Sequence, residues 1–472
     1  MVTIPINFTG GDYQHRSRPL TKQWTRNFWP QPIPNQKAKS NYILQSFYGL
    51  KLWKEFSGGL NRGELKSKGV LYRVVGTTLY SVDKTGTHTA LGFIGGSNRC
   101  IMSPLGDQII VANGSGVVYV YDGTNVTQVT SPNIGNPKGV TVLNNQAIYD
   151  KGTGQGFDVS DVGAPGTING LNNASAEASP DDLQLPYAYS ETLYLFGTET
   201  TELWWNSGQG NPPFDRIQGA SLKVGLGAIY SLAENPDFLF LFGSDKQFHT
   251  LTGGTTSVDT VISTPAMAEE FEEYAVTEDC IGWTMQLGGQ WFYVATFPNQ
   301  NVTWVYPVGG EWFQWGTGNT GRIRADGYVN IFDKHIVSDF ESGNLYELDA
   351  KTYTDVGETI IRTRDTAPLH GGLFQADGKE FELTSLMFFL ETGVGLLEGQ
   401  GSNPSMAVSF SKDGGKTFGT ERFVKVGTLN DGRKCVKLTN CGRYTTCVIR
   451  IRVSDPIYWA IYNGVAEVEV CI

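Results

Sequence analysis

Short apolar strands alternate with glycine-containing or polar turns along most of this chain, and a second strand rich in Tyr and Val follows each turn. The first unit is LYRVVGTTLYSVD (71–83), and the next is QIIVANGSGVVYVYDG (108–123). Apolar runs of about four to eight residues, bounded by turn residues, are typical of β-strands rather than helices. The pattern therefore predicts an all-β protein built from many short, paired strands.

These units recur at a nearly constant spacing. The second strands of seven units begin at residues 79, 118, 157, 202, 248, 303 and 345, so the steps are 39, 39, 45, 46, 55 and 42 residues. A period of about 40–45 residues is typical of a β-propeller, in which every blade is a four-stranded sheet and stacked blades bury each other's faces. We expect six or seven blades within residues 57–355. The count stays open because one blade is usually completed by strands from both ends of the ring.

Two segments depart from the repeat. In STPAMAEEFEEYAVTEDC (263–280), Ser263 or Thr264 can cap a helix and Pro265 suits its first turn. This predicts a short helix inserted between blades. After residue 355 the repeat ends, and new strands are expected over 381–392, 406–419, 434–455 and 459–471. Residues 356–472 are therefore predicted to form a C-terminal antiparallel β-sandwich.

Residues 1–56 have the composition of an extended arm. Three prolines in WPQPIPNQ (29–36) block a helix. The arm is rich in aromatic residues, which include Trp24, Phe28, Trp29, Tyr42, Phe47, Tyr48, Trp53 and Phe56. A disordered tail rarely has so many, so we expect them to pack against this chain or a partner. Neither a secretion signal nor an apolar run of about 18–20 residues is present, so no membrane span is expected.

Charge is unevenly distributed along a chain whose net charge is −11. Residues 1–68 hold eleven Lys and Arg against three acids, a net +8, which leaves −19 for the remainder. Residues 171–290 hold seventeen acids against three Lys and Arg. A basic arm could bind nucleic acid or an acidic surface. We favour a second interpretation, in which the arm docks on an acidic neighbour such as another copy of this chain. The cations lie among prolines and aromatics rather than on one helical face.

The arm therefore supplies the candidate interface for a neighbouring subunit or partner. Its candidate residues are Arg16, Arg18, Trp24, Arg26, Trp29, Tyr42 and Phe47.

A reaction centre is not expected. The five histidines lie outside any HExxH pattern, GxSxG does not occur, and neither Walker A nor GxGxxG follows a predicted strand. Cys435, Cys441 and Cys447 lack the spacing of zinc ligands, so free thiols are expected. We therefore predict no catalytic, cofactor-binding or metal-binding residues.

One stretch does suggest sugar chemistry. SKDGGKTF (411–418) has the pattern of an Asp-box, a hairpin that recurs in sialidases. It lies outside the predicted propeller, and Arg322 and Arg324 lack the third arginine that a sialidase needs to hold a carboxylate. We interpret it as a turn that joins two sandwich strands. A carbohydrate-active propeller, sialidase-like or depolymerase, or a receptor-binding propeller remains the alternative function.

An ordered set of motifs resembles a known family. RNFWP (26–30) is followed by YILQSFYGL (42–50) and then by SGGLNRGELKSKGVLYRVVGTTLYSVD (57–83). This order resembles the packaged-DNA stabilisation proteins, also called tail hub or tail accessory proteins, of short-tailed bacteriophages (podoviruses). The chain departs from the family at Tyr48, where a proline is usual. ISTPAMAEEF (262–271) followed by GGQWFYVATFP (288–298) is a second similar stretch.

The resemblance implies a structural virion protein without catalysis. Such proteins form a ring, usually of six copies, below the portal and adaptor proteins. They retain packaged DNA, carry tailspikes or fibres, meet a needle or plug protein, and form the nozzle through which the genome is ejected. Double-stranded DNA would then pass through the lumen without sequence-specific binding. The resemblance implies assembly in the host bacterial cytoplasm and a final place in the virion tail.

Overall fold

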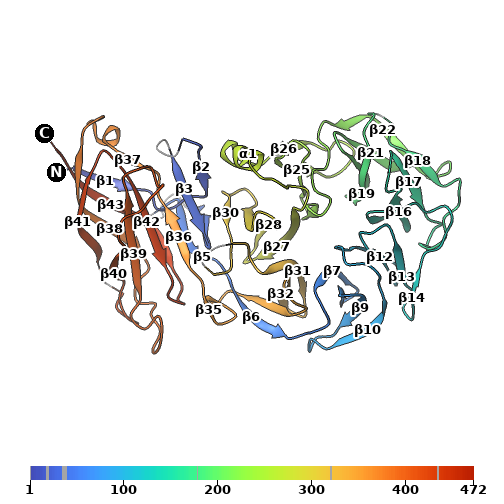
Figure 1. Ribbon diagram of the computed structural model, residues 1–472, viewed down its shortest axis with the longest axis horizontal. Coiled ribbons are helices and arrows are strands. Elements are labelled where there is room, and N and C mark those ends of the chain that lie inside the picture. Colours follow the sequence, from blue (N-terminus) through green and yellow to red (C-terminus); the bar gives the residue numbers. More distant parts are fainter. Residues whose placement is uncertain are drawn as a thin grey trace.

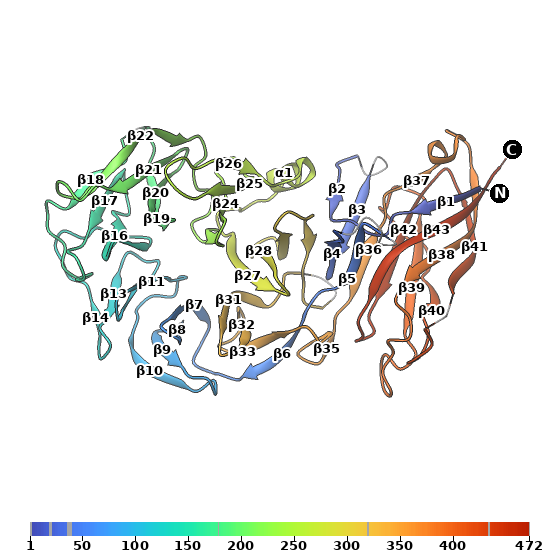
Figure 2. The ribbon, with the colours of Figure 1, turned by 180° about the vertical axis from the view of Figure 1, so that it is seen from behind.

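Two bodies lie side by side along the long axis of the molecule in the computed structural model (Figures 1 and 2). One is a ring of small sheets, and the other is a pair of packed sheets that holds both described chain ends. The structure describes residues 2–17, 21–34, 40–177, 179–318, 321–432 and 435–471. The fold is thus a β-propeller with a C-terminal β-sandwich, as the sequence predicted.

The propeller consists of seven four-stranded blades within the described residues, each an antiparallel sheet. The first three blades are β7 (Asn61–Ser67), β8 (Val70–Val75), β9 (Thr78–Val82) and β10 (His88–Phe93); β11 (Ile101–Leu105), β12 (Gln108–Ala112), β13 (Val118–Tyr121) and β14 (Val126–Gln128); and β15 (Val140–Leu143), β16 (Gln146–Asp150), β17 (Gly156–Val159) and β18 (Asn173–Ser175). The next two are β19 (Leu183–Tyr189), β20 (Thr192–Gly197), β21 (Thr201–Asn206) and β22 (Phe214–Leu222); and β23 (Ala233–Glu234), β24 (Phe238–Phe242), β25 (Phe248–Thr252) and β26 (Asp259–Val261). The last two are β27 (Ile281–Leu287), β28 (Gln290–Phe297), β29 (Val302–Pro307) and β30 (Phe313–Gln314); and β31 (Ala325–Ile331), β32 (Lys334–Asp339), β33 (Leu345–Asp349) and β6 (Gly49–Lys54).

The seven repeating stretches of the sequence are the third strands of these blades, β9, β13, β17, β21, β25, β29 and β33. Blade seven takes its outer strand, β6, from the N-terminal arm. Lys54 pairs with Leu345, and Leu50 pairs with Leu348. The ring is therefore closed by strands from both ends of the propeller sequence.

Neighbouring blades bury their faces on each other. Val74 of blade one and Val111 of blade two lie in one core cluster. Leu71 of blade one packs with Ile336 and Leu345 of blade seven, so the same kind of contact also joins the ends of the ring. Each sheet is too small to be stable alone, and its stability comes from these shared cores.

The predicted helix is confirmed as α1 (Pro265–Glu272), between blades five and six. Thr264 is its N-cap, and its side-chain oxygen accepts a hydrogen bond from the Met267 amide at 3.3 Å. Met267 and Phe271 are buried on its inner face. The polar face, rich in glutamate, remains outside.

The sandwich contains two sheets. The first consists of β1 (Val2–Ile6), β4 (Phe28–Pro32), β5 (Tyr42–Ser46), β38 (Phe381–Leu390), β41 (Val436–Tyr444) and β43 (Ala460–Val470). The second consists of β2 (Tyr13–Gln14), β3 (Lys22–Arg26), β36 (Arg362–Asp365), β37 (Leu369–His370), β39 (Ser405–Ser411), β40 (Arg422–Lys425) and β42 (Thr446–Val453). A short 3-10 helix, η1 (Gly371–Phe374), follows β37, and the small strands β34 (Thr354–Asp355) and β35 (Glu358–Thr359) extend blade seven.

The N-terminal arm is divided between the two bodies. β1, β4 and β5 join the first sandwich sheet, β2 and β3 join the second, and β6 belongs to the propeller. Phe8, Phe28 and Leu44 are fully buried in the sandwich core beside Trp459 and Ile461. β3 also contacts β30 through one parallel bridge, Arg26 to Gln314, so the second sandwich sheet continues into blade six.

The cysteines and the helices add two simple findings. All six cysteines lie among the described residues and are free thiols. Within the described residues, neither α1 nor any other helix has the length and apolar character needed to cross a membrane.

Candidate interaction surfaces

Trp29 and Phe47, two of the predicted interface residues, lie inside this chain. Trp29 on β4 is 5% exposed, and Phe47, just after β5, is 1% exposed. Both rings pack edge-to-face on Phe292 of β28, with centroid distances of 5.0 Å for Trp29 and 5.5 Å for Phe47. Phe47 also lies 5.0 Å from Phe313 and from Trp315. These rings therefore anchor the segment that crosses from the sandwich to the propeller on blade six.

Trp24 and Arg26 on β3 also contact blade six. The Trp24 indole N–H donates to Gln314 Oε1 at 2.9 Å. Arg26 is 7% exposed and donates from Nη2 to the Gly321 carbonyl at 3.1 Å. Burial lowers the pKa of its guanidinium. Four predicted interface residues therefore meet at blade six, whereas Tyr42 is half-buried on the sandwich strand β5.

Arg16 is exposed and lies at a cleft between the two bodies. Gln14, His15 and Arg16 form one wall of this cleft of about 630 Å³, and four glutamates of α1 and its C-terminus lie on the other wall, Glu269, Glu270, Glu272 and Glu273. Arg18 lies outside the described residues. The partner contact predicted for the seven arm residues stays a prediction, and among the described ones Arg16 has the most solvent-accessible position.

A buried arginine fixes the junction from the sandwich side. Arg364 on β36 donates to the Gly11 carbonyl at 2.8 Å, to Thr25 Oγ1 at 2.7 Å and to Gln23 Oε1 at 2.8 Å. Burial lowers the pKa of this arginine to about 10. Burial raises the pKa of nearby Asp12 well above its usual range, and the charge of Glu270 raises it further. These contacts hold the start of the chain between the bodies and give it a structural role.

The propeller axis is nearly closed. A cavity of about 220 Å³ lies there, and all seven blades or their connecting loops contribute to its wall. Arg99 spans this space and forms an ion pair with Asp326 at 2.6 Å, while the Tyr230 hydroxyl donates to the Arg99 carbonyl at 3.0 Å. At ~30 Å³ for each water, the cavity has room for about seven waters. It is far too small for a nucleic-acid duplex.

The arginines that might hold a sugar carboxylate are already engaged. The Arg324 guanidinium pairs with Asp355 at 3.0 Å, and that of Arg322 stacks on Phe340 at 3.4 Å from the ring centre. Within the described residues, no group of three or more His, Cys, Asp or Glu is arranged to hold a metal ion. The geometry therefore offers no support for sialidase-like chemistry.

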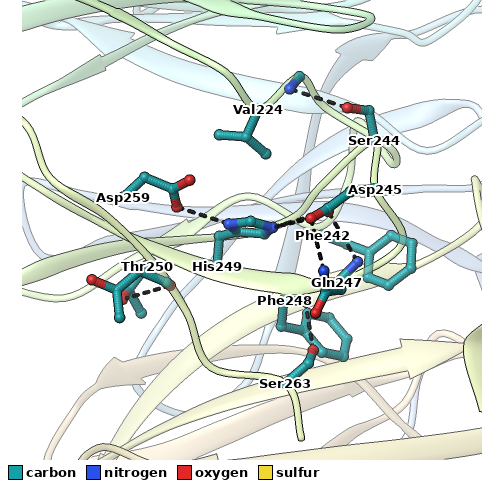
Figure 3. A network of polar contacts seen from close by, with 12 residues as sticks. Val224, Phe242, Ser244, Asp245, Gln247, Phe248, His249, Thr250, Asp259 and Ser263 are labelled. Carbon is teal, nitrogen blue, oxygen red and sulfur yellow. Dashed lines mark hydrogen bonds and ion pairs between the residues drawn. The ribbon is translucent and has the colours of Figure 1, made fainter. Parts of the chain in front are cut away.

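His249 on β25 is held between two aspartates in blade five (Figure 3). Its Nδ1 lies 2.7 Å from Asp259 Oδ1, and its Nε2 lies 2.9 Å from Asp245 Oδ1. Burial alone would lower its pKa, but the hydrogen bonds and charges of the two aspartates outweigh burial and raise the pKa of His249 to about 9. A histidine that is protonated near neutral pH and bound on both nitrogens cannot act as a general base. It instead ties the β24–β25 turn to β26.

The Asp-box uses its polar atoms in its own turn. Asp413 Oδ1 accepts hydrogen bonds from the Ser411 hydroxyl at 2.6 Å and from the Thr417 amide at 2.9 Å. The Gly415 amide donates to Ser411 Oγ at 2.8 Å. These bonds hold the pKa of Asp413 well below its usual range. The stretch joins β39 to β40 in the sandwich, which confirms its interpretation as a structural hairpin.

Two family models match the sequence in succession. The model described as "Bacteriophage P22 Gp10, beta-propeller" matches residues 2–353, and the one described as "Bacteriophage P22 Gp10, beta-sandwich" matches residues 368–469. A search of curated proteins found no match.

Solved structures similar to this chain are distant propellers. Virginiamycin B lyase from Staphylococcus aureus has a TM-score of 0.41 and 11% identity, over 68% of this chain and 98% of that chain. BamB from Moraxella catarrhalis has a TM-score of 0.39 and 10% identity, over 74% and 98%. The WD40 propeller of Doa1 has a TM-score of 0.40 and 11% identity, over 64% and 97%. Likenesses this remote have no bearing on function.

Proposed function

The chain belongs to the bacteriophage P22 Gp10 family of phage structural proteins, and on this premise we propose that it is the hub of a short phage tail. As a hub it attaches below the portal and adaptor proteins, retains the packaged DNA, carries tailspikes or fibres, and contributes to the path of genome ejection. One observation carries this proposal. The propeller model and the sandwich model of one family match this chain one after the other, over residues 2–353 and 368–469.

The junction between the two bodies suits a part that must withstand mechanical force. The chain crosses from sandwich to propeller between β5 and β6, and β3 links the sandwich sheet to β30 of blade six. Buried Phe47 and Arg364 fill the space on the two sides of this crossing. Two bodies joined by a shared sheet and a shared core resist bending, which suits a part that must stay attached under the pressure of packaged DNA.

The closed axis limits where DNA can pass. Because the Arg99–Asp326 ion pair lies in the small space on the propeller axis, we place the path of the DNA outside the single subunit. A conduit therefore has to lie between subunits, inside a ring of this chain, for which the family resemblance implies six copies. The ring, the adaptor and portal above it, and a needle or plug below it are the partners in this proposal.

Net charge supports a lumen that does not hold DNA. The chain carries −11 overall, and residues 171–290 carry seventeen acids against three Lys and Arg. Basic contacts would add salt-dependent affinity for phosphates, whereas acidic walls leave a duplex mobile. Sequence-specific reading of DNA has no place in this mechanism.

Particles that lack this chain test the proposal. Heads assembled without it should lose their DNA, measured as nuclease-accessible genome, and should lack spikes in electron micrographs. Supplying the chain during assembly should restore both. Particles without it that remain full, stable and spike-bearing would refute the proposal.

A further inference from the structure

One face of the propeller is acidic over three neighbouring blades. Because the innermost strands of all blades run the same way, the turn between second and third strands and the loop into the next blade share one face. Residues 176–177, 179–182, 198–200, 223–232, 243–247 and 262–280 lie there, and they hold eleven acids against two lysines. One of the lysines, Lys246, pairs with Glu272 at 3.0 Å. The acidic face is defined by their exposed carboxylates, Glu177, Asp182, Glu199, Glu269, Glu273 and Glu278.

One segment of the sandwich has the opposite charge. Residues 405–454 contain ten Lys and Arg against three acids, a net +7. β40 and β41 are the terminal strands of the two sheets, and in both views they lie on the side of the sandwich away from the propeller (Figures 1 and 2). The basic edge is defined by four exposed residues on and beside β40, Lys412, Lys416, Phe423 and Lys425. Within the described part of the chain, its three lysines form no ion pair.

Protection of a strand edge does not account for this surface. Lysines on edge strands commonly prevent pairing with other chains. Here Arg422 already closes the edge, because its guanidinium donates to the Asn440 carbonyl at 2.8 Å and to the Thr439 carbonyl at 2.6 Å on β41. A protective edge also gives no reason for the ring of Phe423, which is 68% exposed among the lysines.

The two surfaces match each other in chemistry. Along the sequence, Phe423 lies between Arg422 and Lys425, and Val276, 36% exposed, lies between Glu273 and Glu278. An apolar centre within a charged rim is the usual composition of a protein interface. Because β40 and β41 lie on the side of the sandwich away from the propeller, the basic edge does not face the acidic face of its own copy (Figures 1 and 2).

Resting on the proposed assembly into a ring, we propose that the basic edge of one copy docks on the acidic face of the next copy. Such a contact uses two different surfaces and is repeated from copy to copy, so it can close into a ring. Phe423 packs against the region of Val276, and the lysines lie opposite the glutamates of α1. Attraction between the opposite charges orients the two copies as they meet, and the apolar contact at the centre stabilises the complex.

Charge exchange tests this contact. Full-length protein is added to heads that lack it, and rings on heads are counted by negative-stain microscopy. The pair Lys416→Glu with Lys425→Glu, and separately the pair Glu269→Lys with Glu273→Lys, should each reduce the ring count about tenfold. All four changes in one chain restore opposite charges at every contact, and the count should recover to within about threefold of the unmodified protein. Phe423→Ala should also lower the count without any change of charge.

The matched control is Lys84→Glu with Lys351→Glu, which makes the same change of charge at exposed lysines elsewhere on the propeller. It should leave the ring count unchanged. Circular dichroism and the melting temperature of each variant establish that it is folded.

The outcomes separate this inference from the proposed function. Unmodified protein that forms no ring on heads refutes the proposed ring and this contact together. Rings that form normally from both charge-reversed pairs refute the contact alone. A folded four-residue variant that stays defective also refutes it. Loss of short-duplex DNA binding in the Lys416→Glu, Lys425→Glu variant, with rings intact, would overturn it in favour of a nucleic-acid surface.

Discussion

Replacing His249 by glutamine should remove a pH-dependent part of the stability of blade five. The protonated ring bridges Asp245 in the β24–β25 turn and Asp259 on β26, and its side chain is 3% exposed. Its pKa is about 9, against an ordinary value of 6.5. At about 1.4 kcal/mol for each pH unit, this difference corresponds to about 3 kcal/mol.

The direction of the pH dependence follows from the raised pKa. Below pH 6.5 the ring is protonated in both folded and unfolded chains, and the full contribution is present. Between pH 6.5 and 9 the unfolded chain loses this proton while the folded chain keeps it, so the contribution falls as the pH rises. The stabilisation is therefore lost on the alkaline side, whereas a carboxylate with a lowered pKa loses its contribution on the acid side.

Melting temperature measured from pH 6 to 10 tests this reasoning. About 1 kcal/mol shifts the melting temperature by about 2–4 °C for a cooperative unit of 150–250 residues, so the unmodified protein should exceed His249→Gln by several degrees at pH 6. The gap should close above pH 9. His370→Gln, at an exposed histidine, is the matched control and should follow the unmodified protein. A gap that stays constant with pH would refute the assignment of a protonated, stabilising His249.

Four further changes test the packing. Phe47→Ala should lower the free energy of unfolding, measured in urea, by about 3–5 kcal/mol, because its ring is only 1% exposed. The control Phe389→Ala, at a residue that is 43% exposed, should lower it by less than about 1 kcal/mol. Equal losses for the two variants would contradict the packing. Arg62→Lys should lower the free energy of unfolding by at least about 2 kcal/mol, because Arg62 donates hydrogen bonds to five backbone carbonyls and lysine cannot reach them all. An unchanged urea midpoint would contradict the importance of these hydrogen bonds. Deleting residues 2–54 should make blade seven sensitive to trypsin, because β6 is its outer strand; a resistant propeller would show that closure does not need β6. Arg422→Ala should free the β40 edge and increase aggregation on gel filtration, and a monodisperse variant would contradict its closing role.

Local sequence was sufficient for the elements that repeat or carry their own signals. The third strand of each blade is apolar and aromatic because it lies in the middle of a small sheet, so its position could be read from spacing alone. Thr264 and Pro265 marked the start of α1 because capping is a short-range interaction. The Asp-box was correctly assigned to a turn, because its hydrogen bonds join residues at most four apart.

Long-range pairing could not be read in the same way. Gln45 pairs with Ala460, and Lys54 pairs with Leu345, across hundreds of residues. No local pattern specifies which distant strand will accept an edge strand, because register depends on the burial of the whole face. The sequence therefore predicted that the arm's aromatics would pack, but could not say that the arm supplies strands to both bodies.

Counting charges along the sequence misjudged the surface for a related reason. The positive charge of residues 1–68 includes Arg26 and Arg62. Both side chains are buried and donate hydrogen bonds to backbone carbonyls of loops. These arginines stabilise the fold and are not accessible to an acidic partner. Residues 405–454 of the sandwich carry a net charge of +7 as well. Arg16, Lys51, Lys66 and Lys68 remain exposed, and Lys412, Lys416 and Lys425 add a second positive surface at the edge of the sandwich that lies away from the propeller. Because this edge and the acidic propeller face lie apart within one copy, a contact between two copies can use both surfaces.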